Sequence, residues 1–482
     1  MKRMKREEVN LPLSNTTIQL PSTINYVTDT AAKHNYSQIP YFISDTTGFI
    51  DFNEGENNVT LPIFFGDSSI IQFPKGIKRD IRRIPKRVLK TIDSNIEMAI
   101  EKCFLFVSSL TSTVYKEYND YWKGLSSTIL HQQFKKGNDN TRIYRYIIEA
   151  LTNSTSSRLP IIEVKQNDLG NDSYQVGNYS KQYRFHPNRV NQALVTYYLK
   201  FEENIKRLRK HHLRQLSKAS KNIIGRNLIA VYESIELPTT EEILKQADDL
   251  IRIKHRSKKG KLLTKLNKKS KSYYSNPESR SFVEENINQF EYYTKRGFRV
   301  PTIGDYKSGG RVVDSFNLMS SWIRQMIKIE NEPILELDFK ALHPNIAKSL
   351  YDGTNHQITH EIVSMSLKTP LKKVKIEHLS FFNKRIDDMK KSPLFQYYYT
   401  KERVMLENII SDKKQYGYKI TSQRLFKKEV EIMSSIIEQL NRLDIYVLYV
   451  YDALYCKESD KAIVSDIMNN TIIEHKVNTK IG

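Results

Sequence analysis

The chain has 482 residues, 39% of them hydrophobic, and its 76 Lys and Arg against 54 Asp and Glu give a formal net charge of +22. This length allows two or three domains, and the charge favours a polyanionic partner such as nucleic acid, although a codon bias toward Lys, Asn, Ile and Tyr would raise it too. Two cysteines exclude a disulfide framework, and no apolar run approaches the roughly 20 residues of a membrane span. We therefore expect a cytoplasmic protein, or one of the host cytoplasm if it is viral, with no membrane partner.

Residues 1–140 give little indication of chemistry. Short strand-like runs between turns fill residues 1–75, where we interpret Asp45, Asp51 and Glu54 as part of a solvated loop rather than a nuclease site. A basic segment then leads into an amphipathic helix, whose apolar residues recur at helical spacing. We assign this region no role.

Residues 141–250 predict a helical DNA-binding region. "TRIYRYIIEALTN" is helical, "PIIEV" is a short strand, and "NDSYQVGNYSKQYRF" has the alternation and the Gly177-Asn178 turn of a β-hairpin. Helices followed by a two-stranded wing form a winged helix, a common DNA-binding module. The alternative is a small hairpin beside unrelated helices.

Two basic clusters follow in chain order. "KRLRKHHLRQLSKASK" lies within the helical region, and "RIKHRSKKGKLLTKLNKKSKS" leads into residues 251–300, which we predict to be a basic linker or thumb-like segment. Clustered cations track the phosphates of nucleic acid, whereas the alternative is a solvated charge run. The candidates for nucleic-acid contact are Lys206, Arg207, Arg209, Lys210, Lys258, Lys259, Lys261, Lys268 and Lys269.

From residue 301 onward the pattern becomes more specific. "ILELDF" predicts a strand that carries Asp338 at its end, and "PNIAKSLYDG" predicts a helix that follows it. "DIYVLYVYDALYC" predicts a β-hairpin with Asp452 at its bend, preceded by an amphipathic helix over 422–443. Each aspartate interrupts an apolar strand, which is costly for a carboxylate without a positive partner.

Either aspartate alone is expected to cap a turn, but the pair indicates a metal site. Two aspartates on neighbouring strands can jointly bind two divalent cations, Mg²⁺ or Mn²⁺, about 3.5–4 Å apart. Such a pair of ions activates an attacking oxygen and stabilises a leaving one, which is the chemistry of nucleotidyl transfer.

Several motifs resemble those of the template-directed DNA polymerases. "ELDFKALHPNIA" resembles their first palm motif, and "VYDALYCKES" resembles their third, which in polymerase family A is His-Asp-Glu at a hairpin bend. "GGRVVDSFNLMSSWIRQMI" is similar to the run before the first motif, and "DKAIVSDIMNNTIIEHKVNTKIG" to the helix and strand that close a family A palm. The resemblance implies a palm in residues 301–482 with a fingers insertion at about 354–420. The layout suggests a phage, a plasmid or another mobile element as the source.

The resemblance implies roles for individual residues. Asp338 and Asp452 would be the catalytic, metal-binding aspartates, and Phe339 would offer its backbone carbonyl to a metal. His343 stands where the family carries a bulky side chain that excludes a 2′-OH, which favours deoxynucleotides. The alternative for His343 is a turn residue packed before Pro344.

The sequence also departs from the family pattern. Tyr451 and Ala453 stand where family A has His and Glu, so a third carboxylate is missing, and "DFKALHP" also resembles the first motif of family B. Between 354 and 420 we find no Arg-x3-Lys followed by Tyr-Gly, and we choose Lys375 as the triphosphate-binding lysine. The expected nucleotide-binding residues are His343, Lys375, Lys372, Arg385, Arg324 and Arg311.

We therefore expect an α+β protein, with a polymerase-like palm of antiparallel sheet and helices in its C-terminal part. The N-terminal part is expected to be mostly helical, with a candidate winged helix. The predicted function is a DNA polymerase that transfers dNTPs to the primer of a DNA template-primer. The alternatives are a replication initiator or other DNA-binding protein with an inactive palm, and a metal-dependent nuclease.

Overall fold

The computed structural model describes the chain from residue 69 to residue 482, apart from short gaps. The gaps are 116–121, 136, 138–139, 154–158, 168, 175–179, 190–192, 258–259, 267–278 and 295–298. The strand-like runs before residue 69 lie outside the described residues, as do Asp45, Asp51, Glu54, Lys258, Lys259, Lys268 and Lys269.

The first elements build a hydrophobic core of their own, from Ile71 to Leu199. Strand β1 pairs with β5, and β4 lies between β2 and β3 in a three-stranded sheet. At the centre, Phe73, Phe104 and Tyr197 pack with ring centroids 4.8 to 6.3 Å apart. The elements are β1 (Ile70–Pro74), α1 (Lys75–Arg82), α2 (Lys86–Ile92), α3 (Ile96–Ser108), β2 (Lys123–Gly124), α4 (Ser127–Phe134), α5 (Ile143–Thr152), β3 (Ile162–Val164), β4 (Gln182–Phe185) and β5 (Leu194–Tyr198).

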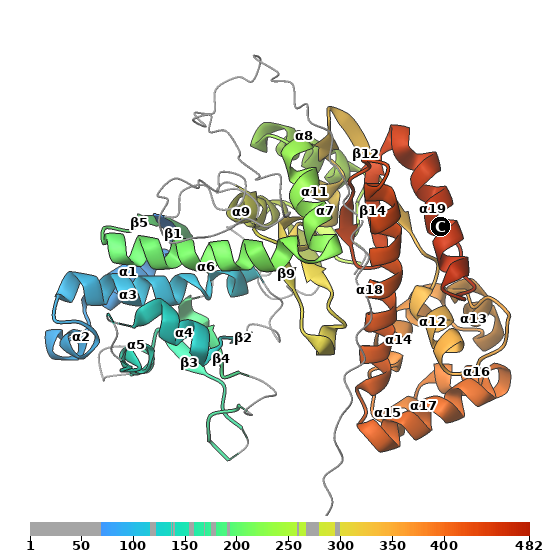
Figure 1. Cartoon of the computed structure of the whole chain (residues 1–482), viewed down its shortest axis with the longest axis horizontal. Helices are drawn as coiled ribbons and strands as arrows, with labels where there is room; N and C mark the ends of the chain where they lie inside the picture. Colours follow the sequence, from blue (N-terminus) through green and yellow to red (C-terminus); the bar gives the residue numbers. More distant parts are fainter. Residues whose placement is uncertain are drawn as a thin grey trace, which may run out of the picture. The chain divides into compact units, whose positions relative to one another are not determined.

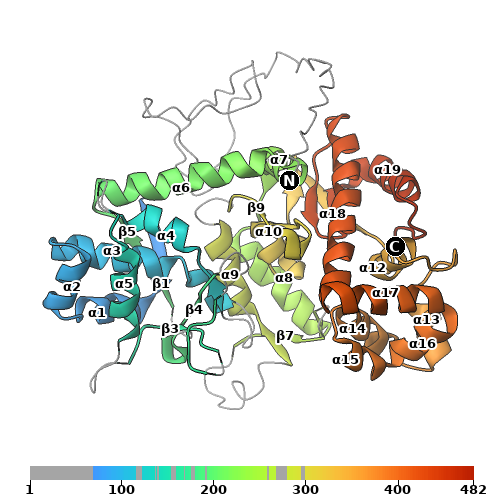
Figure 2. The ribbon, with the colours of Figure 1, turned by 60° about the horizontal axis from the view of Figure 1, so that its bottom comes forward.

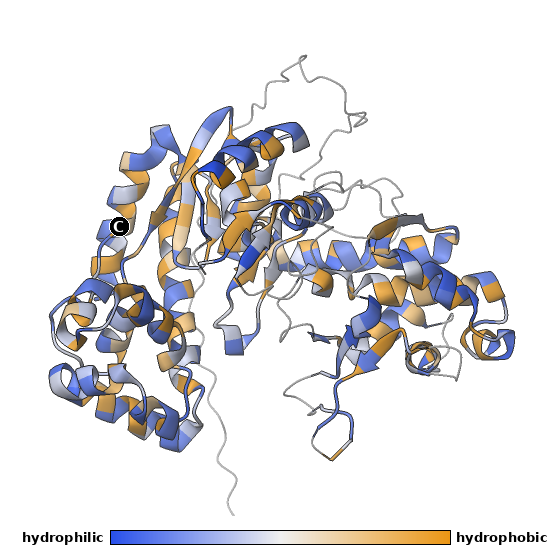
Figure 3. Cartoon of the chain, turned by 180° about the vertical axis from the view of Figure 1, so that it is seen from behind, coloured by the Kyte–Doolittle hydropathy of each residue, from blue (hydrophilic) through white to orange (hydrophobic). Residues whose placement is uncertain are grey.

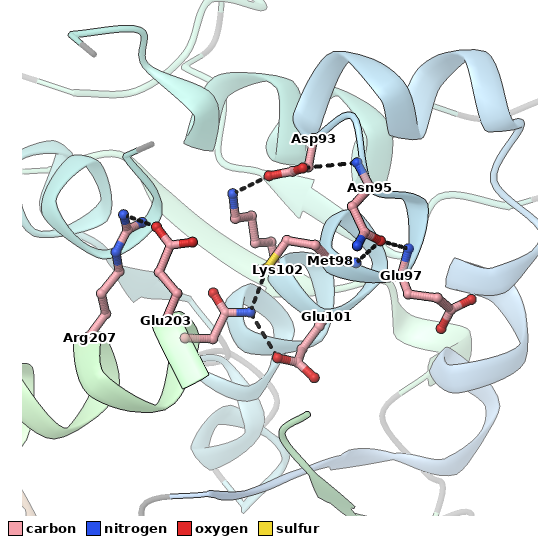
Figure 4. A network of polar contacts seen from close by, with 9 residues as sticks. Asp93, Asn95, Glu97, Met98, Glu101, Lys102, Glu203 and Arg207 are labelled. Atoms are coloured by element: carbon pink, nitrogen blue, oxygen red, sulfur yellow. Dashed lines mark hydrogen bonds and ion pairs between the residues drawn. The ribbon is translucent and has the colours of Figure 1, made fainter. Parts of the chain in front are cut away.

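A buried carboxylate on α3 holds the start of α6 (Glu202–Ser220), as Figure 4 shows in part. Glu101 accepts hydrogen bonds from the backbone N–H groups of Lys200 at 2.6 Å and Phe201 at 3.2 Å, and from Asn204 Nδ2 at 2.8 Å. Phe201 is the N-cap residue of α6, and its side chain makes no capping hydrogen bond. Glu101 therefore supplies from another helix the acceptors that the first turn of α6 needs.

The second core extends from Leu216 to Val477 around a five-stranded antiparallel sheet. The strand order is β13-β14-β12-β11-β6, and β12 and β14 pair along their length at its centre. The chain ends beside this sheet, because Phe339 forms a bridge with Ile481. The strands are β6 (Ile235–Glu236), β11 (Lys328–Ile329), β12 (Glu332–Asp338), β13 (Leu448–Val450) and β14 (Ala453–Lys457).

Helix α18 is a long helix that runs through the second core and packs against several of its other helices (Figure 1). It contacts α7, α12, α17 and α19, and its buried stripe includes Leu425, Met433 and Leu440. That spacing places apolar side chains on one helical face, as the sequence predicts. The helices and short strands of this part are α7 (Ile223–Val231), α8 (Thr240–Arg252), β7 (Leu262–Thr264), β8 (Arg280–Phe282), α9 (Val283–Thr294), β9 (Thr302–Ile303), β10 (Val312–Val313), α10 (Ser315–Leu318), α11 (Ser321–Arg324), α12 (Leu342–Leu350), α18 (Ile420–Asn441) and α19 (Lys461–Glu474).

The segment expected to form a fingers insertion is entirely helical in its ordered elements. Five helices follow one another between α12 and α18, and Figure 2 shows them grouped beside α18. Their buried residues, among them Phe381 and Tyr398, belong to the second core. The helices are α13 (His360–Leu367), α14 (Leu371–Phe381), α15 (Ile386–Lys390), α16 (Pro393–Lys401) and α17 (Arg403–Tyr416).

The mixed helical and antiparallel-strand composition agrees with the α+β expectation, with β7 and β8 as a parallel pair. Most helices in Figure 3 carry both apolar and polar residues, the amphipathic pattern of helices packed on a core. In the part of the chain that the structure describes, no helix has the length and apolar content needed to cross a membrane.

The hydrophobic cores divide the chain at a different place from the predicted boundaries. The change falls at α6, since Leu208 packs on the first core and Leu216 belongs to the second. Strand β6, expected in a DNA-binding region, belongs to the five-stranded sheet, and buried residues of α7 and α8 belong to the second core. In the expected linker over 251–300, β7, β8 and α9 are ordered and contribute apolar side chains to that core. Because helix α6 continues from one core into the other, no Gly-, Ser- or Pro-rich linker separates the two cores there.

The candidate winged helix remains a prediction. Strand β4 contains Tyr183 and Phe185, as expected for the second strand of the hairpin, but it pairs with β3 and β2. The Gly177-Asn178 turn lies outside the described residues.

Candidate active site

The two predicted aspartates lie on paired segments of the central sheet. Asp338 is the last residue of β12 and pairs with Ala453, the first residue of β14. Asp452 directly precedes Ala453 in the two-residue turn between β13 and β14. The sequence separates the carboxylates by more than a hundred positions, and the register of the two strands brings their backbones together.

The β13–β14 turn and the turn between β12 and α12 each contain a non-glycine residue with left-handed backbone dihedral angles. Tyr451, next to Asp452, has φ 59°, and Ala341, just before α12, has φ 49°. Such conformations cost on the order of 1–3 kcal/mol and persist only where the surroundings enforce them. Tyr451 adjoins Asp452 and Ala341 lies three residues after Asp338, but seven other described residues share this conformation, so it does not by itself mark the site.

A third carboxylate, Glu429 of α18, is fully buried beside this hairpin. It accepts a hydrogen bond from Arg311 Nε at 2.7 Å, and His343 Nε2 lies 2.7 Å from its Oε2. Although burial by itself raises the pKa of Glu429, its bonds with His343 and Arg311 outweigh burial and lower it. Glu429 is therefore a buried anion held by two basic side chains.

Aromatic rings fix the arginine in place. The Arg311 guanidinium lies 3.9 Å from the ring centroid of Phe426 and 4.7 Å from that of Tyr451. Because Tyr451 directly precedes Asp452 and Phe426 lies one turn before Glu429, these contacts connect the hairpin bend to α18.

The Asp452 carboxyl lies close to a second negative charge, that of Glu429. Burial raises the pKa of Asp452 and the Glu429 carboxylate raises it further, whereas His343 and Arg311 lower it. Arg311 is hydrogen-bonded to Glu429, so its charge is largely taken up by that carboxylate. A cation at Asp452 would relieve the repulsion between the two acids.

The residues present fit a divalent cation of the Mg²⁺ type. Mg²⁺ takes one or two protein carboxylates and obtains its other ligands from water and substrate phosphates. Asp338 and Asp452 supply two half-buried carboxylates. Within the described ranges, no group of three or more His, Cys, Asp and Glu side chains has the geometry of a metal centre. This excludes a closed, all-protein cage there but not an open site of the magnesium type.

The other residues expected to bind nucleotide lie in three different places. Arg311 and His343 belong to the cluster at Glu429. Arg324 is only 7% exposed, and its guanidinium lies 5.5 Å from the ring of Phe316, so it has the position of a core residue. This burial disfavours direct contact of Arg324 with a nucleotide.

The predicted triphosphate-binding residues lie on the helical insertion. Lys372 and Lys375 are exposed on α14, and Lys372 Nζ lies against Gly260. Arg385 is exposed before α15, with its guanidinium 5.3 Å from the ring of Tyr418. No contact described for these three side chains joins them to Asp338 or Asp452.

The candidates for nucleic-acid contact that the structure describes are Lys206, Arg207, Arg209, Lys210 and Lys261. The first four lie on α6, and Lys261 directly precedes β7.

Sequence reasoning missed Glu429, although a signal was present. Its position continues the apolar stripe of α18, one turn after Leu425 and one turn before Met433. A carboxylate in a core-facing register implies a basic partner. The sequence could not identify that partner, because Arg311 lies 118 positions away.

No protein-family model matches the chain, and no curated protein shows significant similarity to it. Among solved structures, the chain is similar to the POL domain of Pol1 from M. smegmatis in complex with DNA primer-template and dNTP. The TM-score is 0.32 and the sequence identity 8%, over 58% of this chain and 73% of that chain. A likeness at this level carries no weight in the proposals below.

Proposed function

We propose that the protein is a template-directed nucleotidyltransferase, most simply a DNA polymerase that uses a primed DNA template and dNTPs. One observation carries the proposal: the register of β12 and β14 brings Asp338 beside the Asp452 turn, where Glu429 makes the surroundings electronegative. Paired aspartates on adjacent strands are suited to nucleotidyl transfer.

Asp338 and Asp452 would hold two Mg²⁺ or Mn²⁺ ions, and the Phe339 carbonyl is the expected backbone ligand. When bound, such ions would supply Lewis-acid activation of the primer 3′-OH and charge stabilisation on the α-phosphate. The chain's own residues orient this centre. Glu429 fixes Arg311 and His343. The resemblance to the palm motifs would give His343 the contact with the sugar of an incoming nucleotide.

The test is primer extension with Asp338→Asn and Asp452→Asn. Each variant should lose extension of a primed template by at least about a hundredfold, more than the loss of a supporting residue usually causes. Asp388→Asn is the matched control, because its side chain is 55% exposed and pairs with Lys391 on the same helical surface. Extension at the wild-type rate in both site variants would refute the assignment.

A second candidate function is a DNA-binding protein with an inactive palm. The observation that favours it is Ala453 in β14. It occupies the position at which the third palm motif of polymerase family A carries a glutamate. This function predicts salt-sensitive DNA binding without incorporation of labelled nucleotide. Degradation of labelled DNA in the absence of dNTPs would instead indicate a nuclease that uses the same aspartates.

A further inference from the structure

A basic cavity lies between helices α4 and α6, in the part of the chain that the proposed polymerase chemistry does not use. Its volume is about 340 Å³, within the range of sites that hold small ligands. Four of its lining residues are cations: Lys135, Arg207, Lys210 and Arg214. None of its eight described lining residues is acidic.

The spacing of these residues explains how the cavity forms. Arg207, Lys210, His211 and Arg214 occupy positions i, i+3, i+4 and i+7 of α6, so they share one face of the helix. Like charges at this spacing destabilise a helix. The acidic residues of α6, Glu202 and Glu203, lie in its first turn. The face therefore carries three cations, of which Arg207 pairs with Glu203 one turn before it.

Hydrogen bonds hold the two arginines of the lining, Arg207 and Arg214, at the cavity wall. Arg207 uses Nη2 to bind Glu203 at 2.5 Å, while its Nη1 is buried and has no hydrogen-bond partner within the described residues. Arg214 Nη1 donates to Gln132 Oε1 of α4 at 2.5 Å, which holds the guanidinium at the cavity wall. Burial, with the charges of Arg214 and Lys123, lowers the pKa of His211, so its ring is neutral in this positive field.

We propose that this cavity binds a phosphate group of a nucleic-acid strand. The planar, forked donors of two arginines match the oxygens of a phosphate, and the lining adds two lysines and no acidic side chain among its described residues. A strand is favoured over a free phosphate compound because exposed Lys206 and Lys218 continue the positive charge along α6 beyond the cavity.

The test measures the binding of a fluorescently labelled single-stranded oligonucleotide to the full chain by anisotropy, in EDTA so that no divalent cation acts at Asp338 or Asp452. The cavity variant is Arg207→Gln with Arg214→Gln. The matched control is Lys245→Gln with Lys401→Gln, which removes the same charge at two exposed positions outside the cavity. Circular dichroism checks that both variants stay folded.

The cavity variant should bind about tenfold more weakly, and its slope of log affinity against log salt should fall by roughly 0.7 per lost phosphate contact between about 50 and 200 mM salt. The control should change affinity less than about threefold. Equal losses in both variants, or no loss in the cavity variant, would overturn the proposal.

One further measurement distinguishes strand binding at the cavity from binding of a free nucleotide. Metal-free titration with dATP tests a free nucleotide: if the cavity variant loses dATP binding but keeps oligonucleotide binding, the strand proposal is wrong. The oligonucleotide-binding measurement contains neither a divalent cation nor a dNTP. The result is therefore independent of whether the chain polymerises DNA.

Discussion

At the scale of single residues, the most consequential group is the carboxylate of Glu429. It is fully buried and holds Arg311, which is 18% exposed. Buried charge pairs contribute little net stability, but removal of one partner leaves the other charged and desolvated. The cluster therefore fixes geometry at the Asp452 turn more than it stabilises the fold.

Replacing Glu429 by Gln should lower the free energy of unfolding by about 3 kcal/mol, because the Arg311 charge loses its buried partner. Urea unfolding followed by circular dichroism measures this change. Glu431→Gln is the control, since its side chain is 47% exposed and pairs with Lys428 at 3.8 Å. The control should change stability by less than about 0.5 kcal/mol. A loss below about 1 kcal/mol in Glu429→Gln would show that Arg311 finds water or another partner.

At the scale of elements, buried His378 and half-buried His360 join α13, α14 and α16. His378 Nε2 lies 2.8 Å from the Tyr398 hydroxyl, and its Nδ1 lies 3.1 Å from Nδ1 of His360. Burial, with a smaller contribution from the neighbouring His360, lowers the pKa of His378 to about 3, against smaller opposing effects that include Glu377. The folded helices therefore require His378 to be neutral.

This lowered pKa predicts that the helical insertion is destabilised by acid. The unfolded chain binds a proton at His378 below its ordinary pKa of about 6.5, whereas the folded chain does not until pH approaches about 3. The stabilising contribution is complete above pH 6.5 and is lost as the pH falls, by about 2 kcal/mol at pH 5. Urea unfolding at pH 7 and pH 5 should show this loss in the wild type, and less of it in His378→Gln. Identical pH slopes would contradict the prediction.

The capping of α6 by Glu101 is a second prediction at this scale. Glu101→Gln should lower the stability of the first core by about 2 kcal/mol, because an amide accepts the bonds of Lys200 and Phe201 less strongly than a carboxylate does. Thermal unfolding measures the effect. Glu97→Gln on the same helix is the control, since its side chain is 53% exposed. A Glu101 variant as stable as this control would show that the first turn of α6 needs no partner.

At the scale of the whole molecule, the chain has two separate hydrophobic cores that meet along α6. Proteins with several cores often unfold in more than one step. The two tryptophans offer separate reporters: Trp122 packs against Arg184 of the first core region, and Trp322 is buried in the second core.

The single-tryptophan variants Trp122→Phe and Trp322→Phe should therefore report different urea midpoints by fluorescence. Adding Glu101→Gln should shift the midpoint seen by Trp122 and leave that seen by Trp322 nearly unchanged. Coincident midpoints that shift together would show that the two cores unfold as one cooperative unit.

The sequence by itself determined the local elements of the candidate site. The apolar run to Asp338, the helix after it and the hairpin bend at Asp452 all occur where periodicity and turn residues predict them. These features depend on residues close together in the chain, and short-range patterns report them directly. The sharing of metal ions by the two aspartates was predicted from their positions at strand ends, and the resemblance to palm motifs added to that prediction.

Only the tertiary structure decided which distant residues meet. It brought Glu429 to Arg311, placed Arg324 in the core, added β6 to the central sheet and formed the basic cavity between α4 and α6. Each of these outcomes depends on contacts between segments tens to hundreds of positions apart. A single sequence carries no periodicity at that range, because packing and strand register fix such contacts after the local elements have formed.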